Sequence, residues 1–338
     1  MAHSAKFVIG IDLGGTRTKI GLIDRQGRTL LFRTFPTRLD LGRDQSLKGF
    51  ILNVHSFLTL SQKKGAAGAL IGLGVPGTIG REEGIIRLSP NFPEWKDVPI
   101  ARIINDSTML PVFVDNDANV VPYAEKWVGA AKDLNHFACL TLGTGLGSGF
   151  FLNGQPWTGG LGNGPEFGHI TVHPQGLRCG CGNRGCLETL VAAPYLVKKA
   201  QQSLKHQTSP YLTQTLAKGS KTISAHVLFQ GARQKDPYCI SLFAEMGRFL
   251  GRAIAGLVHV LGLEGIILGG GVSRASTIFL PYLQKEFNKR LTMIDPKTVL
   301  LAVSPLGDKS GILGAAKMAL DRSGEWNKYL LHSENIKR

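Results

Sequence analysis

The feature that most constrains this fold is a pattern of strands and helices that occurs twice along the chain. In the first round, β-type segments at 6–13 and 17–24 flank the turn Gly14-Gly15-Thr16, and a third segment follows at 28–35. Helical spacing of apolar residues behind Asp44 predicts a helix. The segments after it predict a strand at 69–73, a helix at 98–106 and a strand at 110–115.

The second round has the same character without sharing sequence. It comprises strands at 138–142 and 149–152 around the turn 143–145, helices at 189–204 and 238–261, a strand at 265–268, a helix at 277–290, a strand at 298–303 and a helix at 310–320. Alternating elements in two halves predict an α/β protein with two sheet-based domains, each with helices on its faces.

The predicted domain boundaries follow from this repetition, and 338 residues suit two domains. We expect a small N-terminal domain over 1–117, completed by a C-terminal helix at about 305–321, and a large domain over 118–304. The polar segment 322–338 is predicted to be a loosely held tail.

Composition argues for a cytoplasmic protein without a membrane partner. The longest apolar candidate, 253–271, is interrupted by His259 and Glu264, and the N-terminus lacks the pattern of a cleaved signal peptide. The net charge of +15 is spread along the chain, apart from a basic stretch within 189–235 that is typical of a solvated helical surface. We therefore expect no nucleic-acid partner.

Three glycine-rich turns lie at strand ends in both halves. Asp12 precedes the first, the second is LGTGLGSG at 142–149, and the third is ILGGGVSRA at 267–275. Each alone could be an ordinary tight turn, but together they predict a nucleotide in a cleft between the domains, with Asp12 holding a hydrated Mg²⁺. The turns fit neither the Walker pattern nor a dinucleotide fingerprint, so NAD is disfavoured.

A candidate general base follows a buried strand in the stretch LPVFVDNDANVVPYAEKW. The strand is predicted to end at Val114 and the next helix to begin near Asn119, which leaves Asp115, Asn116 and Asp117 at the junction. Any one of them could be a helix cap, but three exceed that need. An aspartate here could accept a hydroxyl proton during phosphoryl transfer, while the asparagine holds sugar hydroxyls.

The stretch GHITVHPQGLRCGCGNRGCLE, at 168–188, gathers three of the five cysteines. Cys179, Cys181 and Cys186 with His169 would complete a Cys₃His set for a structural, tetrahedral Zn²⁺. His173 is a competing ligand that spacing does not exclude, and three incidental thiols in a glycine loop are the alternative to a metal site. The other cysteines, at 139 and 239, stand alone, so a disulfide framework is not expected.

These motifs resemble those of the ROK family of sugar kinases and repressors, and within it the bacterial-type glucokinases. The resemblance runs from Ile9 to about Ala316, and its most specific part is E-x-G-H at 166–169 followed by C-x-C-G-x-x-G-C-x-E at 179–188. DLGGT at 12–16, GVPG at 74–77, PNFPEW at 90–95, DND at 115–117, LGTGLG at 142–147 and LGGGV at 268–272 occur in the family's order.

The resemblance implies a two-domain actin-like ATPase (ribonuclease H-like) fold with an interdomain cleft, and an ATP- and Mg²⁺-dependent kinase acting on the 6-hydroxyl of D-glucose. It implies Asp117 as general base and sugar contacts from Gly77, Asn91, Asn116, Asp117, Glu166, His169 and Glu188. It also implies zinc held by His169, Cys179, Cys181 and Cys186. ATP would contact Asp12, Gly14, Gly15, Thr16, Lys19, Gly143, Thr144, Gly145, Gly269, Gly270, Gly271 and Val272.

The sequence departs from the family pattern directly before Glu166. Gly164 and Pro165 stand where the family usually has Ala-Gly, and proline fixes φ and removes a donor. This departure bears on sugar preference more than on reaction type. Two other functions remain as alternatives to a glucose kinase. One is a kinase of fructose, mannose, N-acetylglucosamine or N-acetylmannosamine, and the other is a sugar-responsive transcriptional regulator without its DNA-binding domain. The resemblance also suggests a homodimer or higher homo-oligomer.

Overall fold

The computed structural model describes residues 7–63, 70–162, 164–203, 209–217 and 222–336, the last of these by backbone alone from residue 325 onward. The chain divides into two compact units. The first unit is made of residues 1–133, 156–164 and 306–338, and the second of residues 134–155 and 165–305.

The first unit is built on a five-stranded sheet in the order β3-β2-β1-β4-β7. Its strands are β1 Phe7–Leu13, β2 Arg17–Asp24, β3 Thr29–Pro36, β4 Ile71–Val75 and β7 Val112–Asn116. The first three strands form the antiparallel meander that the glycine turn predicted, and β4 and β7 run parallel to β1. The carboxyl ends of β1, β4 and β7 therefore share one edge of the sheet.

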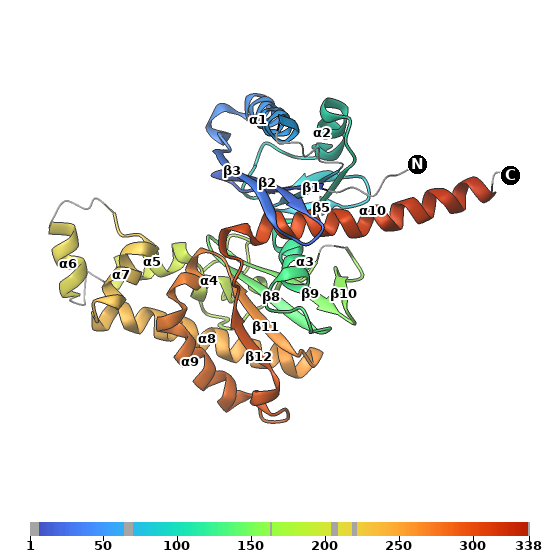
Figure 1. Cartoon of the computed structure of the whole chain (residues 1–338). Helices are drawn as coiled ribbons and strands as arrows, with labels where there is room; N and C mark the ends of the chain where they lie inside the picture. Colours follow the sequence, from blue (N-terminus) through green and yellow to red (C-terminus); the bar gives the residue numbers. More distant parts are fainter. Residues whose placement is uncertain (1–6, 64–69, 163, 204–208, 218–221, 337–338) are drawn as a thin grey trace. The chain divides into compact units, whose positions relative to one another are not determined.

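Helices cover both faces of this sheet (Figure 1). On one face, Ile9, Ile11 and Leu13 of β1 belong to a buried cluster with residues of α1 (Arg43–Lys63) and α2 (Ile100–Thr108). On the other face, Val8 packs with Ile312 of α10 (Ser310–Ile336). This alternation is the two-residue period of a strand buried on both sides.

The second unit repeats the arrangement with a sheet in the order β10-β9-β8-β11-β12. The strands are β8 Phe137–Leu142, β9 Leu146–Leu152, β10 Gln155–Trp157, β11 Gly265–Gly269 and β12 Leu300–Val303. Here β8 and β9 are antiparallel, whereas β11 is parallel to both β8 and β12.

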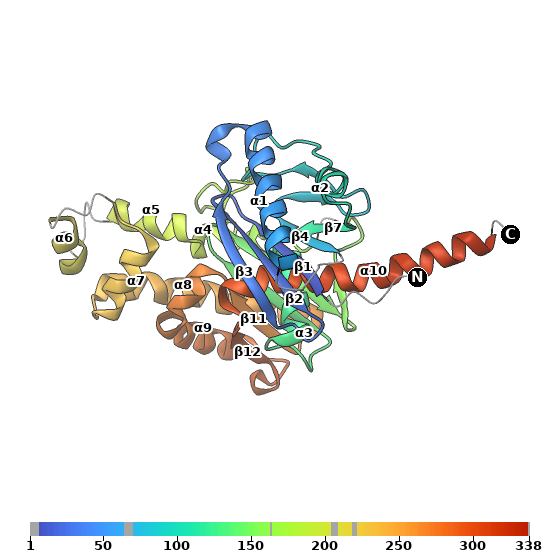
Figure 2. The same ribbon diagram turned by 45° about the horizontal axis from the view of Figure 1, so that its top comes forward.

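The helices of the second unit contribute most of its buried apolar cluster. They are α4 Glu188–Val191, α5 Ala193–Ser203, α6 Pro210–Ala217, α7 Ala225–Arg233, α8 Pro237–Leu261 and α9 Ser276–Arg290. Among them α8 and α9 lie side by side (Figure 2), in contact through Gly247 and Gly251, because a side chain at either glycine would meet the α9 backbone.

Several predicted elements have different bounds in the structure. The predicted helix at 189–204 is two helices, because the backbone at Ala192 is extended, and its last residue lies outside the described residues, as do residues 6 and 69 of the predicted strands. A short hairpin of β5 (Thr78–Gly80) and β6 (Ile85–Leu88) was not predicted, and neither were α6 and α7. The final helix continues to Ile336, not to about 320.

In the described part of the chain, none of the helices is both long enough and apolar enough to cross a membrane.

Candidate active site and metal centre

The predicted base lies where β7 meets helix α3 (Asp117–Val128). Asn116 is the N-cap of α3: its Oδ1 accepts hydrogen bonds from the N–H groups of Ala118 (2.8 Å) and Asn119 (3.3 Å), and its Nδ2 donates to the carbonyl oxygen of Gly77 (3.0 Å). Asp117, the first helical residue, accepts a hydrogen bond from Ala118 N–H at 3.0 Å. The positive end of the helix dipole favours a negative charge at this position.

The strand and the helix meet without the gap that the sequence predicted. The expected bounds, Val114 for the strand and Asn119 for the helix, were wrong: β7 continues through Asp115 and Asn116, and α3 begins at Asp117. The cause is the Asn116 cap, which satisfies the first free N–H groups of α3 directly at the strand end.

Asp115 points into the protein, where its side chain is 1% exposed. Its Oδ1 accepts from Asn116 N–H at 2.8 Å and from Asn119 Nδ2 at 3.4 Å, and its Oδ2 lies 2.8 Å from Nε of Arg81. The Arg81 contact is an ion pair whose angle is not that of a hydrogen bond. Burial raises the pKa of Asp115, and the positive charge of Arg81 opposes that rise.

The predicted sugar-side loops of the first unit lie beside these groups. Gly77 has φ of 116°, and a Cβ there would lie 2.2 Å from the carbonyl oxygen of Leu88, so the position requires glycine. Asn91 lies next to the first glycine turn, since a Cβ on Gly15 would be 3.4 Å from Nδ2 of Asn91. The side chains of Phe92 and Trp95 are buried, and their stacked rings have centroids 4.9 Å apart. They anchor the loop that presents Asn91.

The first glycine turn closes the β1–β2 hairpin next to Asp12. Gly14 N–H donates to the carbonyl oxygen of Arg17 (3.1 Å), and Thr37 donates to that of Gly14 (2.6 Å). Lys19 Nζ lies 3.3 Å from Oδ2 of Asp12. Burial raises the pKa of Asp12, and Lys19 opposes this effect. This turn offers a carboxylate and a lysine next to a glycine-lined loop.

The second and third glycine turns lie against each other in the second unit. Gly270, with φ of 84°, follows β11, and a Cβ there would lie 2.4 Å from the carbonyl oxygen of Leu142, directly before the second turn. Within the second turn, Gly143 N–H donates to the Gly145 carbonyl at 3.0 Å. The third turn continues into a 3₁₀ helix over Gly271–Ala275 before α9, so it joins strand to helix less directly than predicted.

Glu188, the first residue of α4, connects the second turn with the cysteine cluster. Its Oε2 accepts a hydrogen bond from Leu146 N–H at 3.0 Å, and its Oε1 lies 3.3 Å from Sγ of Cys179. A Cβ on Gly145 would lie 2.6 Å from Oε2, so the turn and the carboxylate are in close contact.

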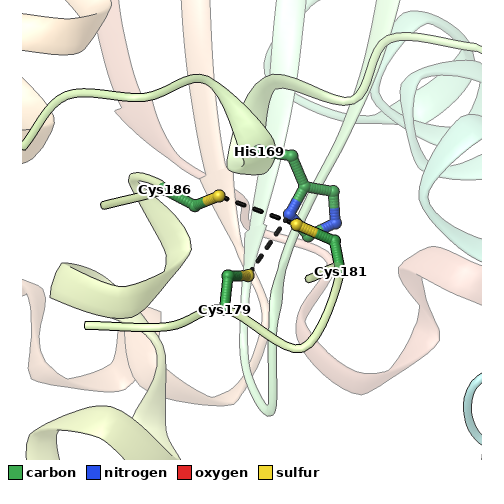
Figure 3. Close-up of side chains that lie close together, drawn as sticks. All are labelled: His169, Cys179, Cys181 and Cys186. Carbon is green, nitrogen blue, oxygen red and sulfur yellow. Dashed lines mark hydrogen bonds between the residues drawn. The ribbon is translucent and has the colours of Figure 1, made fainter. Parts of the chain in front are cut away.

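His169 and the three cysteines form one cluster, with Nδ1 or Nε2 of the imidazole and the three Sγ atoms all within 4.8 Å of one another. Figure 3 shows the three sulfur atoms gathered around the imidazole of His169. The Sγ atoms of Cys181 and Cys186 are 3.7 Å apart, and Sγ of Cys179 lies 3.6 Å from Nδ1 of His169. His173 is exposed and does not belong to the group.

Two of the distances between the donor atoms of this cluster match those of a tetrahedral ion. With Zn–S and Zn–N distances of about 2.3 and 2.0 Å, the edges of a tetrahedron are roughly 3.5–3.8 Å long, which agrees with the two distances above. Burial raises the pKa of the Cys179 thiol to about 12. For Cys181 burial also acts to raise the pKa, but the Asn183 N–H and the neighbouring thiols lower it overall.

Glu166 is presented by a loop that is fixed on both sides. The buried hydroxyl of Ser148 donates to the Pro165 carbonyl at 2.6 Å and accepts from Phe167 N–H at 3.0 Å. Oε2 of Glu166 lies 3.9 Å from Nε2 of His169, and its side chain is 64% exposed. Partial desolvation raises the pKa of Glu166, the charge of His169 lowers it, and that of Glu188 raises it further.

The predicted site residues divide between the two units. Among the residues described, the first unit contains Asp12, Gly14, Gly15, Thr16, Lys19, Gly77, Asn91, Asn116 and Asp117. The second unit contains Gly143, Thr144, Gly145, Glu166, His169, Cys179, Cys181, Cys186, Glu188, Gly269, Gly270, Gly271 and Val272.

Sequence reasoning missed the groups that hold these residues in place. Arg81 and Arg322 occur in no motif, and Ser148 stands within LGTGLGSG at 142–149, where it was read only as a small turn residue. The partners of all three lie far along the chain; Arg322, for example, donates to the carbonyl oxygen of Val114, 208 positions away. A lone arginine or serine carries no periodic or spacing signal, so no feature of the sequence alone could have found them.

Comparison with known proteins identifies the class to which this fold and site belong. The model of the ROK family matches residues 8–322. The chain therefore belongs to the ROK family, and it has the family's two-domain actin-like ATPase fold.

Individual relatives match over nearly their whole length. The chain is 36% identical to the glucokinase of Thermotoga maritima over 317 residues, which are 94% of this chain and 98% of that protein. It is similar to the crystal structure of the ROK hexokinase of Thermus thermophilus (32% identity, TM-score 0.79, 94% and 99% of the two chains). It is also similar to the crystal structure of a ROK family glucokinase of Streptomyces griseus in complex with glucose and AMPPNP (30% identity, TM-score 0.79, 93% and 99% of the two chains).

Proposed function

We propose that this chain is an ATP-dependent glucokinase that transfers the γ-phosphoryl group of ATP to the 6-hydroxyl of D-glucose, giving glucose 6-phosphate and ADP. The observation that carries the proposal is the β7–α3 junction, where the Asp117 carboxylate stands at the positive end of α3 beside Asn116, the N-cap of that helix. Support comes from the relatives that are named as glucokinases, one of them crystallised with glucose and an ATP analogue.

The reaction needs a proton acceptor and a site for the triphosphate. Asp117 accepts the proton of the 6-hydroxyl while the 6-oxygen of the sugar bonds to the γ-phosphorus of ATP. The bond between the γ-phosphorus and the oxygen that bridges it to the β-phosphorus breaks, which releases ADP. Asn116 and Gly77 orient the sugar, since their mutual hydrogen bond fixes both. The glycine turns would receive the phosphates, and Asp12 would hold Mg²⁺, which would supply positive charge to neutralise the phosphates.

The Cys₃His cluster serves in this proposal as a structural zinc site. His169, Cys179, Cys181 and Cys186 would fill all four positions of a tetrahedral ion, which leaves none for a substrate. The ion would fix the imidazole of His169 next to Glu166, so that both side chains can meet sugar hydroxyls. Glu188 is the third predicted sugar contact of this unit.

The test is purified protein with Mg-ATP and a panel of sugars, including fructose, mannose and the N-acetylhexosamines. We expect ADP release with glucose, and Asp117→Asn should lower kcat by about 10²- to 10⁴-fold because the proton acceptor is lost. Asp106→Asn, which changes an exposed aspartate of α2, is the control and should retain activity. No turnover with any hexose, or full activity in Asp117→Asn, would contradict the proposal.

Three further parts of the proposal have separate measurements. Faster turnover on another sugar of the panel would assign that sugar in place of glucose. Specific retention of DNA in a gel-shift would favour a regulator. We also propose a homodimer or higher homo-oligomer in the cytoplasm, which light scattering and cell fractionation test.

A further inference from the structure

The surroundings of Asp115 contain a network of charged side chains that the reaction described above does not use. Asp115 is buried at 1% exposure, whereas Arg81 (20% exposed) and Arg322 (16% exposed) are partly buried. A buried charge is costly unless it is paired, so a buried carboxylate with two partly buried guanidinium groups at one strand end calls for a reason.

One side of the network reaches the residues of the proposed reaction. Oδ1 of Asp115 accepts the N–H of Asn116 at 2.8 Å and Nδ2 of Asn119 at 3.4 Å. These bonds orient the peptide between Asp115 and Asn116 and the first turn of α3. The positions of Asn116 and Asp117 therefore depend on where the Asp115 carboxylate is held.

The other side anchors that carboxylate to three separate segments of the first unit. Arg81, which follows β5, lies 2.8 Å from Oδ2 of Asp115 and donates through Nη1 to the hydroxyl of Thr158 at 3.2 Å. Arg322 of α10 donates to the carbonyl oxygens of Arg81 (3.0 Å) and Val114 (3.1 Å). The strand end is thus tied to the β5–β6 hairpin, to Thr158 and to α10.

We propose that Arg81 and Asp115 are positioning residues for phosphoryl transfer: their ion pair fixes the strand end that presents Asn116 and Asp117. This inference rests on the proposed sugar kinase function and adds residues to it. A planar guanidinium can meet a carboxylate and a hydroxyl at the same time, which a lysine cannot reproduce. Both residues act through their neighbours, because the contacts described for them are with Asn116, Asn119 and Thr158.

The experiment compares Arg81→Met, Asp115→Asn and the double variant with the wild-type enzyme. Displacing a reacting group by about 1 Å can lower the rate by roughly 10²-fold, so we expect each single variant to lose about that much in kcat, with a higher KM for glucose. The double variant should be no slower than the slower single variant, since both changes break the same contact. The dissociation constant of ATP should change less than about twofold, because the phosphate turns are separate from the network.

Arg87→Met is the matched control, because Arg87 lies in the same hairpin and makes ion pairs with Glu83 and Asp97 that are exposed. It should retain wild-type kcat and KM. Thermal unfolding of each variant, with assays well below its Tm, separates positioning from loss of folded protein. If kcat is unchanged in both single variants, or falls only together with folded fraction and ATP affinity, the inference is overturned.

The activity of the wild-type enzyme distinguishes failure of the positioning role of Arg81 and Asp115 from failure of the proposed kinase function. If the wild-type enzyme turns over glucose and the variants match it, the inference fails alone. If the wild-type enzyme releases no ADP with any hexose, the proposed function fails and the inference falls with it.

Discussion

Asp12 lies on the face of β1 that meets α10, and its neighbour across this contact is Gly311. A Cβ at Gly311 would lie 2.7 Å from both Cγ and Oδ2 of Asp12. Asp12 is therefore confined between the glycine and Lys19, whose Nζ lies 3.3 Å away. A residue that is proposed to hold Mg²⁺ needs this kind of confinement, because a metal site loses affinity when its ligand can rotate away.

Gly311→Ala should displace the Asp12 carboxylate and leave the fold intact, because a side chain yields more easily than backbone. We expect the KM for Mg-ATP to rise by about tenfold, with Tm changed by only a few degrees. Steady-state kinetics at saturating glucose and a thermal melt measure both. Gly324→Ala, in the same helix with no atom within 4 Å of the added Cβ, is the control. Equal KM values for the two variants would show that Asp12 is not confined in this way.

At the scale of elements, the contact of α10 with the first sheet depends on positions without side chains. A Cβ on Gly10 of β1 would lie 1.9 Å from the carbonyl oxygen of Ile312, and one on Gly72 of β4 would lie 1.9 Å from that of Ala315. A Cβ on Gly314 of the helix would lie at the same distance from the carbonyl oxygen of Val120 in α3. The helix thus lies directly against the backbones of two strands and one helix.

Gly72→Ala should destabilise the first unit by about 3 kcal/mol, because the added methyl group has backbone and not a flexible side chain to displace. Urea unfolding measures the change in the free energy of unfolding. Gly49→Ala is the matched control: Gly49 lies within α1 with no atom within 4 Å of the new Cβ. That change should stabilise by up to about 1 kcal/mol through helix propensity. Similar effects of the two substitutions would contradict the close contact of α10 with β4.

At the scale of the whole molecule, the two units share one sheet order, but among the described residues the Cys₃His cluster belongs to the second unit alone. In the second unit, the cysteine loop joins His169 to Cys186 through two isolated antiparallel bridges, Thr171 with Cys186 and Arg178 with Arg184, and not through a longer strand or helix. A bound ion would add to the few backbone hydrogen bonds that cross this loop, since metal affinity adds to folding free energy when the site forms only in the folded state.

Removal of the metal should destabilise the protein. We expect purified protein to contain one zinc per chain, and a chelator or Cys181→Ser should remove it and lower Tm by roughly 10 °C. Elemental analysis and calorimetry measure these quantities. Cys139→Ala, which changes a buried cysteine of β8 outside the cluster, should keep its zinc. Metal-free wild-type protein with an unchanged Tm would contradict the zinc proposal.

Local patterns predicted the strands and helices whose signals are confined to neighbouring residues. The meander around Gly14 and the hairpin around Gly143 are confirmed because a two-residue period and a glycine turn are sufficient to specify a hairpin. The β5–β6 hairpin was missed because its strands are only three and four residues long. The helix at 189–204 was predicted as one element because Pro194, which stands in the first turn of α5 just after the break at Ala192, was not read as a helix start.

The sequence by itself determined the repeated α/β architecture and the residue types of the site: glycine turns, the Asp115–Asp117 segment and the three clustered cysteines. Those features depend on the spacing of residues that are close together in the sequence, and this spacing does not depend on how the elements pack. Tertiary structure decided which partners these residues have. It brought His169 and not His173 to the thiols, and it placed Arg81 and Arg322 at the end of β7. Contacts between residues far apart in the chain depend on how the elements pack, and no local pattern records that packing.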